Sequence, residues 1–129
     1  MATLFTRIIN GEIPCYKIAE NDQFIAFLDI LPVSKGHTLI VPKKEIDYIF
    51  DLPDEELQAL NVFAKEVARK IQAVIPCKKI GVSVIGLEVP HAHMHLIPIN
   101  KIHDMNFEKE RLEFTPEEYT ELSQKISNA

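Results

Sequence analysis

The sequence predicts a single α+β domain in which an antiparallel sheet is covered by one long helix. Three observations lead to this prediction. Short apolar segments alternate with turn residues, which is typical of strands joined as hairpins. One segment, residues 53–75, instead repeats its apolar side chains at helical spacing. The length of 129 residues fits one compact domain.

Five strands are expected, in the order in which turn residues divide the chain. Asn21 and Asp22 separate the first two strands and form a hairpin turn between them. A loop containing Pro32, Ser34 and Gly36 precedes the third strand. The predicted strands are residues 16–20, 23–28, 37–41, 80–85 and 93–99.

Three helices are expected beside the sheet. The long helix 53–75 has proline in its first turn, acidic residues at 54–56, and Pro76 after its end. Thr3 predicts a cap for a short helix over residues 4–10. Thr115 and Glu118 form a capping box that starts a C-terminal helix reaching about Ser127. We therefore divide the single domain, residues 1–129, into a catalytic core, 1–103, and a C-terminal extension, 104–129.

Composition and charge narrow the class of protein. Apolar residues make up 47 % and charged residues 26 %, no apolar run could span a membrane, and the N-terminus does not resemble a signal peptide, so we expect a cytoplasmic protein without a membrane partner. Residues 104–129 contain seven acidic and three basic residues and so account for most of the net charge of −5. No basic patch for nucleic acid is apparent. Cys15 and Cys77 form no C-x-x-C motif and are expected to be free thiols.

Three of the five histidines, His91, His93 and His95, are spaced two residues apart and precede the apolar segment 96–98. On a strand, this spacing would place the three imidazoles on one face, about 6.6 Å apart. His37 begins another apolar strand after a glycine-containing loop. It could join the same cluster.

Three interpretations of this cluster are open. The histidines could be a structural group satisfied by hydrogen bonds. They could bind zinc, for which Glu88, His103 or Asp104 would offer a further ligand. They could also carry out nucleophilic catalysis, in which a neutral imidazole attacks phosphorus while its neighbours bind phosphate oxygens or pass a proton to the leaving group.

Four segments resemble the histidine triad, or HIT, superfamily. His91-Ala-His-Met-His-Leu-Ile-Pro98 is similar to the histidine signature that gives the superfamily its name. Phe5–Pro14 resembles its N-terminal stretch, and Phe27–Pro32 and His37–Lys44 resemble its nucleotide-binding half. The resemblance runs from about residue 4 to residue 99 and implies a HIT-like fold.

The resemblance also implies a function and roles for individual residues. It implies a nucleotide hydrolase or transferase that works through a nucleotidyl-histidine intermediate, usually as a homodimer, and it implies no cofactor. His93 matches the nucleophile, and His91 matches the residue whose backbone carbonyl orients it. His95 and His37 match residues that contact the phosphate. The residues matching the apolar slot for the base are Phe5, Ile8, Ile13 and Phe27, and those matching the ribose contact are Asp29 and, beside it, Ile30.

The sequence departs from the family pattern at two places. The segment before the triad is shorter than in many members and lacks their Asn and Gln, which leaves Ser83, Glu88 and Val89 as its candidates for contacting the nucleotide. Thr3, Thr6 and Glu45 occupy positions where some bacterial members carry ligands of a structural zinc ion. We therefore predict no metal at that position.

We predict a hydrolase acting at the α-phosphorus of purine nucleoside phosphoramidates or dinucleoside polyphosphates, with no bound metal. Two alternatives remain open. One is a metal-dependent hydrolase that uses the same histidines, and the other is a nucleotide-binding module with little catalytic activity.

Overall fold

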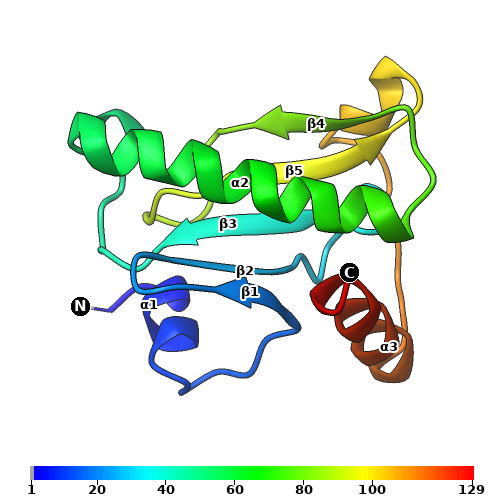
Figure 1. Cartoon of the computed structure of the whole chain (residues 1–129), viewed down its shortest axis with the longest axis horizontal. Helices are drawn as coiled ribbons and strands as arrows, with labels where there is room; N and C mark the ends of the chain where they lie inside the picture. Colours follow the sequence, from blue (N-terminus) through cyan, green and yellow to red (C-terminus); the bar gives the residue numbers. More distant parts are fainter. Residues whose placement is uncertain (1) are drawn as a thin grey trace.

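A computed structural model describes residues 2–129, and its centre is a five-stranded sheet (Figure 1). The strand order is β1-β2-β3-β5-β4, and each of the four pairings is antiparallel. This confirms the predicted α+β fold. The strands are β1 (Lys17–Glu20), β2 (Phe24–Leu28), β3 (Thr38–Pro42), β4 (Lys79–Ser83) and β5 (Met94–Ile99).

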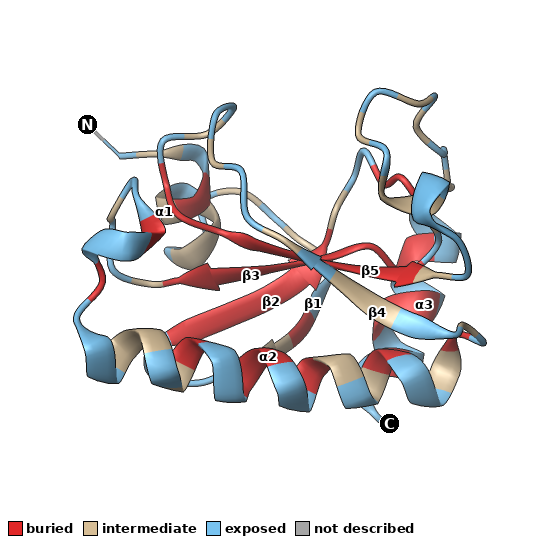
Figure 2. Cartoon of the chain, turned by 90° about the horizontal axis from the view of Figure 1, so that it is seen from above, coloured by how far each residue is buried: buried red, intermediate tan, exposed pale blue. Residues whose placement is uncertain are grey.

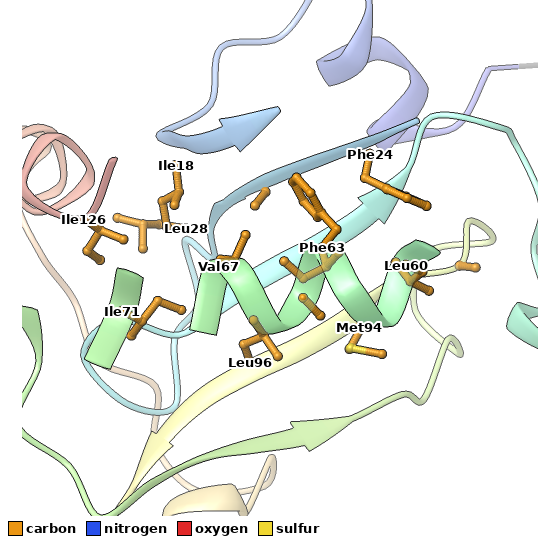
Figure 3. Packing of buried hydrophobic residues seen from close by; sticks show 14 of the residues in the cluster. Ile18, Phe24, Leu28, Leu60, Phe63, Val67, Ile71, Met94, Leu96 and Ile126 are labelled. Carbon is orange, nitrogen blue, oxygen red and sulfur yellow. The ribbon is translucent and has the colours of Figure 1, made fainter. Parts of the chain in front are cut away.

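The long helix α2 (Asp54–Val74) crosses one face of the sheet, as its apolar stripe predicts. Pro53 occupies its N-cap rather than its first helical position. The residues that α2 turns toward the sheet include Leu60, Phe63 and Ile71, all buried (Figure 3). Burial of each such side chain contributes roughly 1.5–3 kcal/mol. These residues belong to the larger of the two apolar clusters in the described part of the chain.

The opposite face of the sheet carries a smaller apolar cluster beneath α1 (Leu4–Ile9). Thr3 caps α1, because its hydroxyl oxygen accepts a hydrogen bond from the backbone N–H of Thr6 at 3.0 Å. Strands β2, β3 and β5 are therefore buried on both faces, whereas β4, at the edge, is only partly buried (Figure 2). The buried members of this cluster are Phe5, Ile25, Phe27, Leu39 and Val41.

The C-terminal segment packs back onto the sheet edge. A short 3₁₀ helix, η2 (Ile102–Met105), follows β5, and α3 (Pro116–Ser127) lies beside β1 and the end of α2. The predicted capping box is present, with Thr115 and Glu118 bonding each other's backbone N–H groups. Tyr119 of α3 stacks on Tyr16 with ring centroids 4.7 Å apart.

The structure corrects several predicted boundaries. Predicted strand 93–99 begins at Met94, because the backbone N–H of Ala92 bonds the carbonyl oxygen of Ile46 in a loop instead of a neighbouring strand. Predicted strand 80–85 ends at Ser83, before the turn at Gly86, whose φ of +73° suits glycine. A further 3₁₀ helix, η1 (Ile49–Asp51), precedes α2 and was not predicted.

Two other predictions can be compared directly with the structure. Cys15 and Cys77 are free thiols, as expected. No helix within residues 2–129 has the length and apolar character needed to cross a lipid bilayer.

Candidate active site

The histidines gather on the face of the sheet that α2 leaves uncovered. His95 lies on β5 opposite Leu39 of β3 and Ser83 of β4. His93 precedes the strand, and its ring lies 5.0 Å from that of His95, centroid to centroid. The prediction of three imidazoles on one strand at about 6.6 Å was therefore wrong in detail, since only His95 lies within β5. The predicted clustering is correct.

His93 is oriented by a backbone hydrogen bond. Its Nδ1 lies 2.8 Å from the carbonyl oxygen of His91, which can only accept a hydrogen bond, so Nδ1 carries the proton. In this tautomer the lone pair lies on Nε2. The ring of Phe5 packs against the imidazole edge to face at 4.9 Å and restricts its rotation. An imidazole held in this way can attack an electrophile through Nε2.

The side chain of His91 is fully buried and both of its nitrogens are engaged. Nε2–H donates to the carbonyl oxygen of Pro42 at 2.7 Å, which leaves Nδ1 to accept a hydrogen bond from the Thr3 hydroxyl at 2.8 Å. Burial lowers the pKa of His91 below its ordinary value. With its ring fixed at both ends, His91 presents its own carbonyl oxygen to His93 in one position.

Thr3, Thr6 and Glu45 form a hydrogen-bond network with His91. The Thr6 hydroxyl donates to the Glu45 carboxylate at 2.7 Å, and the backbone N–H of Thr3 donates to the same carboxylate oxygen at 2.9 Å. The Thr3 hydroxyl then completes the link to His91. The Glu45 carboxylate thus bonds the Thr6 side chain and the Thr3 backbone, and the Thr3 side chain bonds His91.

His37 and His95 form a second oriented pair. The backbone N–H of Val33 donates to Nδ1 of His37 at 3.1 Å, so His37 carries its proton on Nε2. This Nε2–H donates to Nδ1 of His95 at 2.9 Å. The carboxylate oxygen Oδ2 of Asp29 lies 3.4 Å from the same Nε2 of His37. His95 consequently keeps its own N–H on Nε2, where it can donate a hydrogen bond to a ligand.

Burial sets the charge of this pair. It lowers the pKa of His37 and that of His95 to about 3, and the charge of Arg111 acts in the same direction on both. Both rings are therefore neutral at pH 7. His93 offers a lone pair and His95 offers a hydrogen-bond donor on neighbouring rings, which is the arrangement that attack on phosphorus with assistance to an oxygen requires.

Two cavities open beside His93. One, of about 300 Å³, is lined by His93 and His95 together with Asp29, Glu88, Phe107 and Arg111 among others. The other, of about 550 Å³, lies between the η1 segment and residues 84–87 and is also lined by His93. His93 is thus close to space that a small ligand could fill.

The structure brings most of the predicted nucleotide-binding residues near this site. Their surroundings differ, however, from those of an open apolar slot. Phe5 and Phe27 are buried and contact each other at 5.8 Å, and Ile8 and Val89 pack against their cluster. Asp29 and Glu88 line the smaller cavity, and Ser83 lies opposite His95. Ile13 is half-buried, and Ile30 is 69 % exposed beside Asp29.

Two residues of the site were missed from the sequence, namely Phe107 and Arg111. The Phe107 ring lies 4.8 Å from that of His95, and Arg111 lines the same cavity. Both belong to residues 106–114, which form neither helix nor strand, so no periodic pattern marks them. An arginine four residues after an aromatic residue is too common to be a signal by itself.

One cluster has ligand atoms at metal-binding separation. Single side-chain nitrogen or oxygen atoms of Asp29, His37 and His95 all lie within 4.8 Å of one another. The hydrogen bond between His37 and His95 already accounts for the closeness of the rings. A divalent ion bound there would have to displace the Nε2 proton of His37.

The fold and the oriented histidines define the class of protein to which the chain belongs: a small α+β protein with a buried histidine motif beside a cavity. The chain belongs to the HIT family, whose domain matches residues 10–102.

Similar proteins cover most of the chain. A HIT-like protein of Methanocaldococcus jannaschii is 42 % identical over 105 residues, which are 74 % of this chain and 77 % of that protein. An adenosine 5′-monophosphoramidase of Schizosaccharomyces pombe is 33 % identical over 131 residues, or 99 % of this chain and 98 % of the enzyme. The crystal structure of a HIT-like protein from Bartonella henselae gives a TM-score of 0.81 at 29 % identity, covering 98 % of this chain and 95 % of that one.

Proposed function

We propose that the protein is a nucleotide hydrolase or transferase in which His93 attacks an α-phosphorus and forms a nucleotidyl-histidine intermediate. The observation that carries this proposal is the hydrogen bond from His93 Nδ1–H to the carbonyl oxygen of His91. It holds the ring as the tautomer with a lone pair on Nε2 and supports the imidazolium that forms on attack. The similarity to adenosine 5′-monophosphoramidases favours a purine nucleotide.

The two steps of this reaction balance without a cofactor. Nε2 of His93 forms a bond to phosphorus as the bond to the leaving group breaks, and the Nε2–H of His95 donates to an oxygen of the phosphoryl group or to the departing atom. Water then attacks the phosphorus as its bond to Nε2 of His93 breaks, which restores the imidazole. The proton that this water releases balances the proton that the leaving group took up in the first step. Asp29, beside His37 in the same cavity, is positioned to accept hydrogen bonds from ribose hydroxyls.

Turnover on a substrate panel tests this proposal. Adenosine monophosphate linked through phosphorus to an amine, and diadenosine polyphosphates, represent the two leaving-group classes. The wild-type protein should cleave at least one class, His93→Ala should lose activity by a factor of roughly 10⁴ or more, and His103→Ala, which removes an exposed histidine of η2, should retain it. Nucleotide binding without turnover of any substrate would instead identify a binding module.

A metal-dependent reaction is the second candidate, because Asp29, His37 and His95 present three possible ligand atoms together. It predicts that a chelator abolishes turnover and that zinc restores it. The covalent mechanism predicts turnover that is unaffected by the chelator, so one titration separates the two candidates.

We also propose that the protein forms a homodimer through β4 and the adjacent face of α2. β4 is an outer strand of the sheet, and Val82 on it is 57 % exposed. Exposed apolar side chains continue from β4 to α2 and η1, which is typical of a surface that a partner covers. These residues are Tyr48, Phe50, Val62, Val82, Val84, Ile85 and Leu87.

A further inference from the structure

The C-terminal strap, residues 106–114, lies against the loop that carries Asp29. The backbone N–H of Leu112 donates to the carbonyl oxygen of Pro32 at 2.9 Å, and Nη1 of Arg111 donates to that of Leu31 at 2.6 Å. The HIT domain match ends at residue 102, so the strap lies outside it. A segment beyond the matched region thus closes one side of the histidine cavity.

Phe107 and Arg111 contact each other within the strap. The Phe107 ring packs against the rings of both His95 and His37, at 4.8 and 6.0 Å between centroids. Nη2 of Arg111 donates to the carbonyl oxygen of Phe107 at 2.9 Å, and the guanidinium carbon lies 5.7 Å from the centroid of its ring. The guanidinium is therefore held beside the histidine pair.

The cavity needs a positive charge if an anion is to bind there. His37 and His95 are neutral at pH 7, and the acidic residues Asp29, Glu88 and Glu108 line the same space. Arg111 is the only lysine or arginine among the described residues that line it. Glu88 and Glu108 are exposed to water, whereas Asp29 and Arg111 are half-buried. The charge of Arg111 is therefore the one that offsets Asp29 at the histidines, while the two glutamates are more strongly screened.

Arg111 also retains donors for a ligand. A guanidinium has five N–H groups, and the hydrogen bonds to Leu31 and Phe107 engage two of them. Three remain, in a planar fork that matches the oxygens of a phosphate group.

We propose that Arg111 binds the phosphate group of the nucleotide, as a substrate-binding residue supplied by the C-terminal strap. This inference rests on the proposed function to the extent that the ligand is a nucleotide. It adds a phosphate contact from a part of the chain to which the family resemblance assigns no role.

Equilibrium binding of AMP and of adenosine tests the proposal, because the two ligands differ only in the phosphate. Isothermal titration would compare the wild-type protein, Arg111→Gln and, as a control with the same charge change on the same strap, Lys109→Gln. Arg111→Gln should weaken AMP binding roughly 10- to 100-fold, the range for hydrogen bonds to a charged group, and leave adenosine binding unchanged. Lys109→Gln should bind both ligands as the wild type does.

The remaining outcomes decide between distinct failures. If wild-type protein binds AMP no better than adenosine, the proposed nucleotide-phosphate function itself fails. If wild-type protein prefers AMP and Arg111→Gln keeps that preference, or weakens both ligands equally, Arg111 is only a structural link to Leu31 and the inference is overturned. Should Arg111→Gln not fold, Arg111→Lys tests the proposal instead. Lysine keeps the positive charge but lacks the planar set of guanidinium N–H groups, so this variant should bind AMP more weakly than the wild type does and should bind adenosine equally well.

Discussion

Nδ1 of His93 lies 2.8 Å from the carbonyl oxygen of His91, and this hydrogen bond determines which nitrogen of His93 can react. The position of the accepting carbonyl oxygen depends on His91, whose ring is held between the Pro42 carbonyl oxygen and the Thr3 hydroxyl. The imidazole of His93 is thus connected through His91 to the cap of α1.

Thr3→Val should therefore weaken both the fold and the site. It removes the hydroxyl that caps α1 and bonds His91 Nδ1, so the free energy of unfolding should fall by about 1–3 kcal/mol. Urea unfolding measures this change. Thr3→Ser keeps the hydroxyl and should stay close to wild type, whereas equal stability of the two variants would mean that the hydroxyl does not hold His91.

The depressed pKa values of His37 and His95 predict an acid-sensitive fold. Each has a pKa of about 3 when folded and an ordinary value of 6.5, so between these pH values the unfolded chain binds more protons. The free energy of unfolding should be fully retained above about pH 6.5 and should fall as the pH is lowered toward about 3.

Urea unfolding at several pH values measures this dependence, with His95→Asn as the informative variant. Its free energy of unfolding should decline less steeply with falling pH than that of the wild type, because one of the histidines with a lowered pKa is gone. The exposed His103→Asn serves as the control and should decline as the wild type does. If the free energy of unfolding depends on pH equally in the wild type and in His95→Asn, the lowered pKa of His95 is refuted.

Val82→Lys should disrupt the proposed homodimer. A charge in the centre of an apolar strand edge opposes pairing with a second copy. Light scattering after size-exclusion chromatography should give a dimer mass for the wild type and a monomer mass for the variant. Leu112→Lys, which changes an exposed apolar residue on the strap, should remain dimeric. A monomeric wild type, or a dimeric Val82→Lys, would exclude this interface.

The sequence was sufficient for the elements whose signals are local. The apolar stripe of α2, the capping box at Thr115 and the turn at Asn21 each specify one element, and each is confirmed. Boundaries of β5 and β4 were less accurate, because they depend on which neighbouring backbone groups are available. Ala92 bonds the loop at Ile46 and so leaves His93 outside the strand.

The site could be predicted only where spacing identified it. The triad spacing located His91, His93 and His95, and the glycine-containing loop drew attention to His37. Phe107 and Arg111 reach the cavity through tertiary packing of a segment without regular structure, which leaves no periodic pattern in the sequence. The binding roles predicted for Phe5, Ile8, Ile13, Phe27 and Ile30 remain predictions.

Mass spectrometry of protein quenched during turnover tests the covalent mechanism most directly. Wild-type protein should carry the added mass of one nucleoside monophosphate, and fragmentation should place it on His93. The adduct should be absent from His93→Ala and present in His103→Ala. Turnover by the wild type without any adduct, together with full activity of His93→Ala, would contradict the account.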